Sequence, residues 1–221
     1  MADVTFRYNR IAHVASGFQI ATALSAAGGA CRGTERISIH DVIIDDMKGS
    51  DYGGFGTLAQ VTSSDPVLKD VTIDHVTAFP PRALFILGGG LDQSRMVNFN
   101  FTNNLVAAGK LDIVPPGGGP KNCSYQPALQ SPQGVLKSCF TNFTFSHNAI
   151  LGSKGGWPSG NFYPSDHAAA GVLGFSEGRY QLCRDKGTDC KKPSPAARAG
   201  ADGKDLGADV EAVFAATKGV E

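Results

Sequence analysis

Charge is scarce in this chain of 221 residues, and the two signs balance. Charged residues make up 18% of the sequence, with 20 Lys and Arg against 20 Asp and Glu. Bulk electrostatics therefore predicts no nucleic-acid partner and no anionic membrane partner. Because no run of 18 apolar residues is present, we expect no membrane span. The opening segment, MADVTFRYNR, has no apolar stretch of the kind that signal peptides contain.

Cysteine is also sparse, and its placement predicts two disulfides. Cys123 and Cys139 flank a loop rich in Pro, Gly, Asn and Ser, and Cys183 and Cys190 enclose the segment CRDKGTDC. Such pairs indicate an oxidising compartment, so we expect a secreted, periplasmic or cell-surface protein. Metal ligation is the alternative, but no Cys-x-x-Cys and no His at ligand spacing favours it. Cys31 is left over, which together with the missing export signal leads us to expect that an N-terminal part has been removed.

A short sequence pattern recurs along the chain. VTFRYNRIAHV begins at Val4 and FTFSHNAILGS at Phe143, and related copies begin at Ile37, Val71 and Val97, spaced 33, 34, 26 and 46 residues apart. Positions one and three of each copy are large and apolar, whereas position two is Thr, Ser or Asn. This alternation is typical of a strand with one buried face. We therefore expect the five starting residues to lie in one interior column.

The sixth position of the pattern predicts a bend. Asn9 and Asn148 occupy it in the first and last copies, and Asn tolerates the left-handed α region. In the middle copies this position is assigned to Val42, Val76 and Thr102. An apolar residue follows the bend and points inward again. The strand therefore continues in a new direction after each sharp turn.

One strand every 26 to 46 residues indicates one coil of a solenoid per repeat. Helices between the copies are the alternative, but Gly-rich and Pro-rich breaks interrupt any helical periodicity there. The intervening sequence has four more strand-like runs, FQIATAL, GTLAQVT, ALFILG and GVLKS. We therefore predict an all-β fold, a parallel solenoid of about five to six coils that stack about 4.8 Å apart.

The pattern apolar-Thr-apolar-x-x-Asn-x-apolar resembles the second strand, Asn turn and third strand of right-handed parallel β-helices, the pectate-lyase-like superfamily. Residues 194–213, SPAARAGADGKDLGADVEAV, are similar to the closing segment of many bacterial secreted β-helix proteins. Residues 157–164, WPSGNFYP, resemble a loop near the end of such chains. The resemblance covers most of residues 3–213. It implies a right-handed single-stranded parallel β-helix with coils in residues 1–175, a closing coil and cap in residues 176–221, and missing N-terminal coils.

The resemblance also implies a carbohydrate partner, and it allows a lyase or a glycosidase. A lyase of this superfamily acts on the first strand of each coil, where carboxylates commonly hold Ca²⁺ and an Arg or Lys is the base. A glycosidase needs two carboxylates about 5 to 9.5 Å apart. The four strand-like runs carry no carboxylate, so they predict a poor groove for either reaction. Lys137, and Arg82 at the margin of one run, are the candidate bases there.

Acidic residues gather instead in the loop DDMKGSDYGGFG. Asp45, Asp46 and Asp51 lie there with Lys48 and Tyr52 between or beside them. The loop is a candidate catalytic or sugar-binding site, and Ca²⁺ is its candidate cofactor, although the spacing does not match an EF-hand. An ordinary solvated connection is the alternative.

Two further groups are candidates for glycan binding. The fourth position of the repeat forms an outward polar row, read down the stack as Arg7, His40, Asp74, Asn100 and Ser146. The fifth position reads Tyr8, Asp41, His75, Phe101 and His147. Arg7, His40 and Asp74 are candidate binders of an anionic glycan, with a solvated face as the alternative. Trp157 and Tyr163 could stack on sugar rings or cover the last coil.

Three functions remain open from the sequence. The first is a carbohydrate-associated extracellular module that binds polysaccharide or completes a catalytic region in an upstream part of the same protein. The second is a polysaccharide lyase or glycoside hydrolase that uses the Asp45–Asp51 loop. The third is a structural spacer or adhesin stalk.

Overall fold

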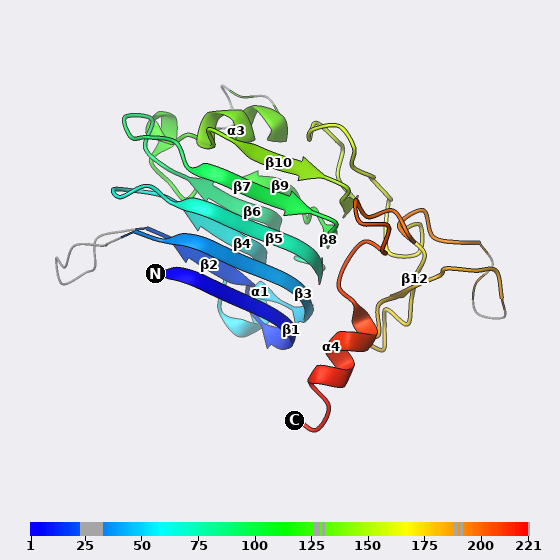
Figure 1. Ribbon diagram of the computed structural model, residues 1–221. Helices are drawn as coiled ribbons and strands as arrows, with labels where there is room; N and C mark the ends of the chain where they lie inside the picture. The colour runs from blue at the N-terminus through cyan, green and yellow to red at the C-terminus, as the bar shows by residue number, and fades with distance from the viewer. Residues whose placement is uncertain (23–32, 126–128, 130, 188–189, 191, 221) are drawn as a thin grey trace.

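The computed structural model describes residues 1–22, 33–125, 129, 131–187, 190 and 192–220. Their regular structure is mostly β-strand, arranged in two parallel sheets and one short hairpin (Figure 1). Cys31 lies outside the described residues, so its pairing stays a prediction. No described helix is long and apolar enough to cross a membrane.

The larger sheet follows the repeated pattern. Its strands are β1 (Ala2–Val14), β3 (Glu35–Met47), β5 (Lys69–Ala78), β7 (Val97–Thr102) and β10 (Phe143–Ser146), extended by β8 (Leu105–Ala107) and β11 (Ala149–Leu151). The smaller sheet contains β2 (Phe18–Ala21), β4 (Thr57–Thr62), β6 (Ala83–Gly88) and β9 (Leu111–Val114). Most successive strands alternate between the two sheets, and each pairs in parallel with the strand one repeat later. The prediction of parallel strands that recur with the repeat is confirmed.

The register corrects one of the five copies. Val4 pairs with Ile37, Ile37 with Val71, Val71 with Phe99, and Phe99 with Phe143. The interior column therefore contains Phe99, and the assignment of Val97 to it was wrong, since Val97 pairs with Lys69. The segment VNFNF is apolar at every second position, so a shift of two residues leaves the pattern unchanged.

This shift of two residues corrects the polar rows as well. The fourth position of that copy is Thr102, which pairs with Asp74, and not Asn100. Similarly, the fifth position is Asn103 rather than Phe101. Because Thr77 pairs with Leu105 directly after it, Asn104 takes the sixth position in place of Thr102. The row of asparagines is therefore longer than the sequence analysis predicted.

The bend lies one residue earlier than predicted. Left-handed backbone, with φ between 47° and 57°, occurs at the fifth position of every copy: Tyr8, Asp41, His75, Asn103 and His147. The asparagine that follows does not carry the bend but points its side chain inward. Asn148 is fully buried, and its Nδ2 donates to the carbonyl oxygen of Phe101 at 2.9 Å. The asparagine thus satisfies backbone groups that the bend removes from the strand ladder.

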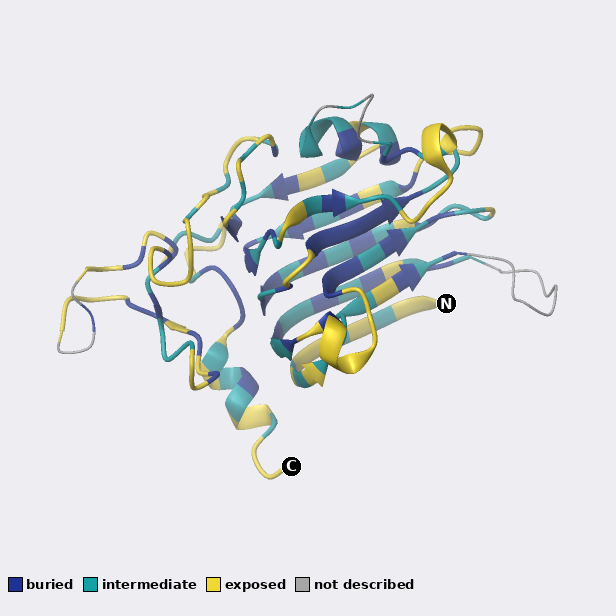
Figure 2. Cartoon of the chain, turned by 180° about the vertical axis from the view of Figure 1, so that it is seen from behind, coloured by how far each residue is buried: buried dark blue, intermediate teal, exposed yellow. Residues whose placement is uncertain are grey.

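Aromatic and branched side chains fill the space between the sheets. Phe85 from β6 meets Phe101 from β7 edge-to-face, with ring centres 5.0 Å apart. Phe101 stacks on Phe145 of the next strand, also at 5.0 Å. Figure 2 shows the buried residues concentrated in the strands between β3 and β10. The inward positions of both sheets therefore form one continuous core.

The run GVLKS is helical, which contradicts the prediction of a strand. It lies in α3 (Pro132–Cys139), where the Ser131 hydroxyl accepts a hydrogen bond from the Gly134 amide at 3.1 Å. The Ser-Pro pair starts the helix because Ser caps the free amides and Pro fits the first turn. Val135 and Leu136 face the main core. The fourth strand of the smaller sheet is instead β9, a short segment between glycine and proline that the sequence analysis missed.

Both predicted disulfides are confirmed. Cys123 is bonded to Cys139 at the C-terminal end of α3, and Cys183 is bonded to Cys190 beside the hairpin of β12 (Val172–Leu173) and β13 (Gln181–Leu182). The other helices among the described residues are η1 (Gly119–Lys121), α1 (Gly49–Tyr52) and α4 (Val210–Ala216).

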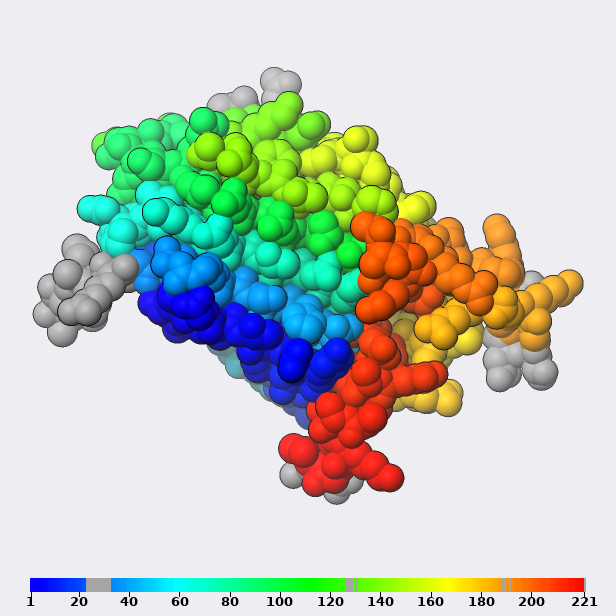
Figure 3. Space-filling view, viewed as in Figure 1, coloured from blue at the N-terminus to red at the C-terminus, as the bar shows by residue number. Residues whose placement is uncertain are grey.

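The C-terminal segment lies along the carboxyl ends of the strands and does not cover an end of the stack (Figure 3). The Gly207 amide donates to the Asn103 carbonyl at 2.7 Å, and the Ala208 amide donates to Thr77 Oγ1 at 2.9 Å. Helix α4 reaches back to β1, where the Arg10 guanidinium lies 5.5 Å from the ring centre of Phe214. This placement encloses a pocket between the strand ends and the C-terminal segment.

Candidate functional site

The candidate site is a pocket of about 500 Å³ at the carboxyl ends of β1, β3 and β5. Strand ends supply one side of it, and residues 175–180 supply the other. Its lining residues are His13, Ile44, Asp45, Asp46, Met47, Lys48, Phe79, Phe175, Ser176, Glu177, Gly178 and Tyr180. Three of the acidic-loop residues that the sequence analysis selected therefore line one pocket.

Asp46 is the centre of a polar cluster at the mouth of this pocket. Its Oδ1 lies 2.8 Å from Lys48 Nζ, and its Oδ2 lies 2.7 Å from His13 Nδ1 and accepts from the Tyr52 hydroxyl at 2.9 Å. The bonds from Lys48, His13 and Tyr52 lower the pKa of Asp46 to about 2. Asp46 therefore remains ionised at any ordinary pH, since each partner favours its charged form.

Asp45 is held deeper, between the first strand and the C-terminal segment. It forms an ion pair with Arg10 and accepts a hydrogen bond from the Tyr180 hydroxyl. Burial raises the pKa of Tyr180, and the bond to Asp45 raises it further. Tyr180 thus stays a protonated donor, and it ties residues 175–180 to β3 across a separation of 135 residues.

Aromatic rings line the same pocket as these carboxylates. Phe79 follows β5 and packs edge-to-face on Phe175, with ring centres 4.9 Å apart, and lies 5.4 Å from Tyr180. His167 stacks on Phe175 at 4.0 Å. Phe79 and Phe175 were not selected from the sequence, because neither belongs to the repeat nor to a charged cluster. The pocket therefore combines fixed carboxylates with aromatic rings.

The loop around α1 carries exposed aromatic residues, of which Tyr52 is hydrogen-bonded to Asp46 of the pocket. Tyr52 is 41% exposed and Phe55 is 59% exposed. The Arg82 guanidinium lies 5.4 Å from the Phe55 ring centre, so the candidate base Arg82 lies beside this loop. Asp51 is exposed and accepts from the Ser50 hydroxyl at 3.0 Å. Figure 2 shows α1 as an exposed element at one end of the molecule.

Acid–base chemistry and metal binding find little support in this pocket. A carboxyl group with a pKa of about 2 cannot act as a general acid near neutral pH. Among the described residues, no three His, Cys, Asp or Glu side chains come together in a group that could hold a metal ion. The loop carboxylates bind Lys48, Arg10 and tyrosine hydroxyls instead, so the structure assembles no calcium cage there.

The fourth-position residues of the large sheet do form an outward row. However, their charged side chains do not form one continuous binding surface. Arg7 pairs in register with His40, and His40 with Asp74. However, His40 Nδ1 lies 2.9 Å from Asp41 Oδ2, and Asp74 Oδ1 accepts from Thr102 Oγ1 at 2.6 Å. These short pairs engage His40 and Asp74, whereas the Arg7 guanidinium lies 5.6 Å from the ring centre of Tyr8.

The remaining candidates lie apart from the pocket. Trp157 is buried and stacks on Phe145 at 4.5 Å, so it covers the core rather than offering a surface for sugar. Tyr163 is 39% exposed. The partial burial of its hydroxyl raises the pKa of this group, and the charge of Asp112 raises it further. Lys137 is exposed on α3, where its carbonyl accepts from Arg95 Nη1 at 3.0 Å. None of the three lines the pocket.

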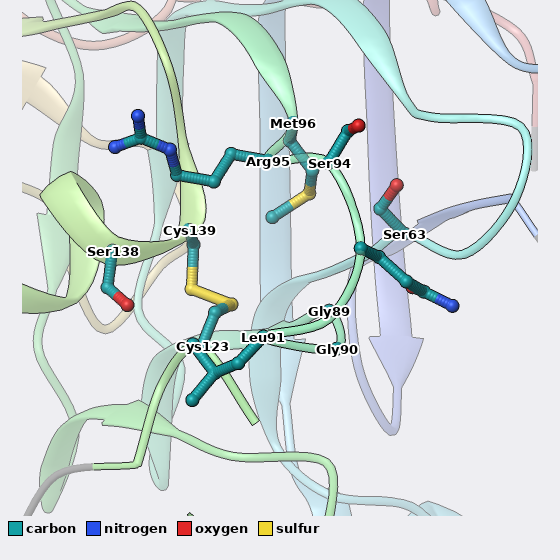
Figure 4. Close-up of a pocket in the computed structure, with 11 residues that line it drawn as sticks. Ser63, Gly89, Gly90, Leu91, Ser94, Arg95, Met96, Cys123, Ser138 and Cys139 are labelled. Atoms are coloured by element: carbon teal, nitrogen blue, oxygen red, sulfur yellow. A yellow bond between two sulfur atoms is a disulfide. The ribbon is translucent and has the colours of Figure 1, made fainter. Parts of the chain in front are cut away.

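A second pocket, of about 290 Å³, lies against the Cys123–Cys139 disulfide (Figure 4). Ser63, Met96 and Arg95 line it with the glycines that follow β6. Arg95 is the one charged side chain among its lining residues. It therefore lacks the paired charges and the aromatic wall of the first pocket.

A third pocket, of about 480 Å³, separates the fifth-position row from the C-terminal segment. His75 is buried there, with Nδ1 2.9 Å from the Gly207 carbonyl oxygen and Nε2 3.3 Å from Asp202 Oδ2. The latter is an ion-pair distance, but its geometry is not that of a hydrogen bond. Asp205 and Asp209 accept backbone amides of this segment, which is the turn-forming role that such residues commonly have.

The fold and the site together define a mostly β protein with parallel sheets and a polar, aromatic-walled pocket beside its strand ends. The chain matches no protein-family model, no curated protein and no solved structure. Its function therefore has to be argued from its own residues.

Proposed function

We propose that this protein is an extracellular carbohydrate-binding module and that the pocket of Asp45 and Asp46 holds the glycan. The proposal includes the finer fold, a right-handed parallel β-helix of the pectate-lyase-like type, whose members act at carbohydrate surfaces. Alternation of strands between two parallel sheets supports this fold, because each passage through both sheets is one coil.

One observation carries the functional proposal: fixed hydrogen-bonding groups and aromatic rings line the same open pocket. Asp46 and Lys48 present polar atoms to it, and Phe79 and Phe175 supply its apolar surface. Sugars offer hydroxyl groups at their edges and C–H groups on their faces. A pocket with this division of polar and apolar surface binds both without rearrangement.

Binding is favoured over cleavage because the two carboxylates of the pocket already have hydrogen-bond and ion-pair partners. Asp46 is kept ionised by three donors, and Asp45 forms an ion pair with Arg10 and accepts a hydrogen bond from Tyr180. A glycosidase needs one carboxyl group that holds a proton near neutral pH. The lyase or glycosidase alternative would require another carboxylate, and the spacer alternative would require that no glycan binds.

A glycan array followed by titration calorimetry tests the proposal. Wild-type protein should bind at least one class of glycan, and Tyr52→Ala should weaken this binding about tenfold, because Tyr52 is an exposed aromatic residue that donates a hydrogen bond to Asp46 of the pocket. Tyr163→Ala is the matched control, because Tyr163 is 39% exposed against 41% for Tyr52 but makes no hydrogen bond, among those of the described residues, to a residue that lines the pocket.

Three other outcomes would contradict the proposal. An array without any bound glycan would reject the binding function and favour the spacer. Release of reducing or unsaturated ends from a bound glycan would instead favour the enzyme. Equal loss of binding in Tyr52→Ala and Tyr163→Ala would place the site elsewhere.

A further inference from the structure

The first strand of the large sheet is an edge: among the described strands it pairs with β3 alone, although α4 meets it at Arg10. β1 contains 13 residues, and none of them is buried, whereas its neighbour β3 buries six. Figure 1 shows β1 as the last strand at one end of the stack, with the β10 strand and α3 at the other. An edge of this length presents a row of backbone groups to which another strand can bond.

The inward side chains of this end are also left partly uncovered. Val4 and Phe6 are half-buried, whereas Ile37 and Ile39, their partners in β3, are 7% and 3% exposed. Phe18 of β2 is half-buried as well and packs edge-to-face on Phe6 at 5.7 Å. Within the part of the chain that the structure describes, the core is therefore left partly uncovered at the β1–β2 end. Soluble proteins rarely leave a long apolar strand edge without a cover.

We propose that this end of the two sheets docks a further parallel β-coil, supplied by another polypeptide segment whose inward residues are apolar. The pairing continues the established ladder of β1 with β3, and the incoming inward residues cover Val4, Phe6 and Phe18. This is β-augmentation, in which backbone bonds give affinity and side-chain alternation gives specificity.

The bends of β1 fix the direction of the incoming strand. Left-handed residues occur in β1 at Asp3, Tyr8 and His13, five residues apart. In β3 they occur at Arg36, Asp41 and Asp46, and each of these lies 33 residues further along the chain. This spacing matches the parallel register of Val4 with Ile37. A parallel neighbour with the same spacing therefore bends at the same points and keeps its apolar residues over the core.

A second copy of the chain does not meet this requirement. Antiparallel pairing of two β1 strands aligns the bends when Tyr8 lies opposite Tyr8 of the second copy. That alignment places Phe6, which faces the main core, opposite Arg10 of the second copy. Arg10 lies in the row of Ile43, which belongs to a separate cluster outside this core. The apolar contact would be lost.

Head-to-tail stacking of copies is also disfavoured, because the opposite end of the large sheet is already covered. Ile150 donates its amide to the Phe162 carbonyl at 2.8 Å, and His147 donates its amide to the Gly160 carbonyl at 2.6 Å. Residues 160–164 thus occupy the edge that a second copy would need. The structure therefore favours a distinct coil as the occupant of the β1 edge.

A synthetic peptide of residues 34–48 is the probe, because it carries the bends and the inward residues of an actual neighbour of β1. A fluorescent label reports its binding to the full chain by anisotropy. We expect the peptide to bind, and a peptide with Ile37→Asp and Ile39→Asp not to bind. In the protein, Phe6→Asp should weaken binding by at least about tenfold, since it removes a large apolar contact.

Thr5→Asp is the matched control, because Thr5 neighbours Phe6 but is exposed on the outer face. It should leave peptide binding unchanged. Circular dichroism of both variants shows whether they are folded, and the Asp-substituted peptide tests the proposal on wild-type protein in any case. Failure of the native peptide to bind, equal binding of both peptides, or a dimer in light scattering that Phe6→Asp abolishes would each overturn the proposal.

Discussion

The side-chain Nδ2 of Asn104 donates a hydrogen bond to Oδ1 of Asn148 at 2.9 Å. The same oxygen accepts the backbone amide of Asn104 at 3.0 Å. Asn104 in turn accepts the amide of Val76 through its Oδ1 at 2.8 Å. Two buried amides thus link the bends of three consecutive strands, and each bend depends on the side chain of the next.

Replacement of Asn148 by Ala should destabilise the protein strongly. The change leaves the Asn104 amide and the Phe101 carbonyl without their partner in a buried environment, and each unsatisfied group costs about 1–3 kcal/mol. We expect the free energy of unfolding in urea to fall by about 2–4 kcal/mol.

Asn9→Ala is the control at the equivalent position of the first copy. Asn9 is half-buried, and its Nδ2 donates to the Arg7 carbonyl at 2.6 Å. Its loss should cost less than about 1 kcal/mol, because water can replace this bond. Equal effects of the two substitutions would contradict the role assigned to the buried asparagine row.

The stability of the protein should depend on the charge of Asp46 at acid pH. Lys48, His13 and Tyr52 lower its pKa from 3.8 to about 2 in the folded protein. Because the folded pKa lies below the unfolded one, the contribution of Asp46 is complete above about pH 4 and is lost as the pH falls toward 2. Urea unfolding across this range should therefore show a smaller pH dependence for Asp46→Asn than for wild type.

Asp51→Asn provides the comparison for this measurement. Asp51 belongs to the same loop, but it accepts from the Ser50 hydroxyl and makes no hydrogen bond to Asp46 or to its three partners among the described residues. Its replacement should leave the acid dependence close to that of wild type. An unchanged pH dependence in Asp46→Asn would show that the cluster does not form in solution.

His75 should hold the C-terminal segment on the strand ends. The Gly207 carbonyl can only accept, so His75 Nδ1 carries a proton and donates to it. Replacement by Ala removes this bond and opens the space between the fifth-position row and residues 200–209. Hydrogen exchange of the backbone amides in residues 200–214 should become faster in His75→Ala, while exchange in β5 and β7 changes little.

His147→Ala is the matched substitution in the same row. His147 Nδ1 lies 3.2 Å from Ser146 Oγ and does not contact the C-terminal segment. Exchange in residues 200–214 should therefore stay as in wild type. Faster exchange in this segment for both variants would mean that the whole row, and not His75, supports it.

Part of the candidate site could be predicted from the sequence, and part could not. Asp45, Asp46, Lys48 and Tyr52 were predicted as one group, because they are close along the chain and chemically suited to bind sugar. Tyr180 could not be predicted with them. It comes from a segment 135 residues away and meets Asp45 only when the C-terminal segment packs against β3.

The sequence alone determined the repeat, its parallel strands and both disulfides, since alternation with a period of two and the positions of cysteines are local properties. The tertiary structure decided the register of the fourth copy, because VNFNF fits two frames and only packing of Phe99 between Val71 and Phe143 selects one. It also decided that GVLKS is helical and that the C-terminal segment closes a pocket. These outcomes depend on contacts between distant residues, which local patterns do not contain.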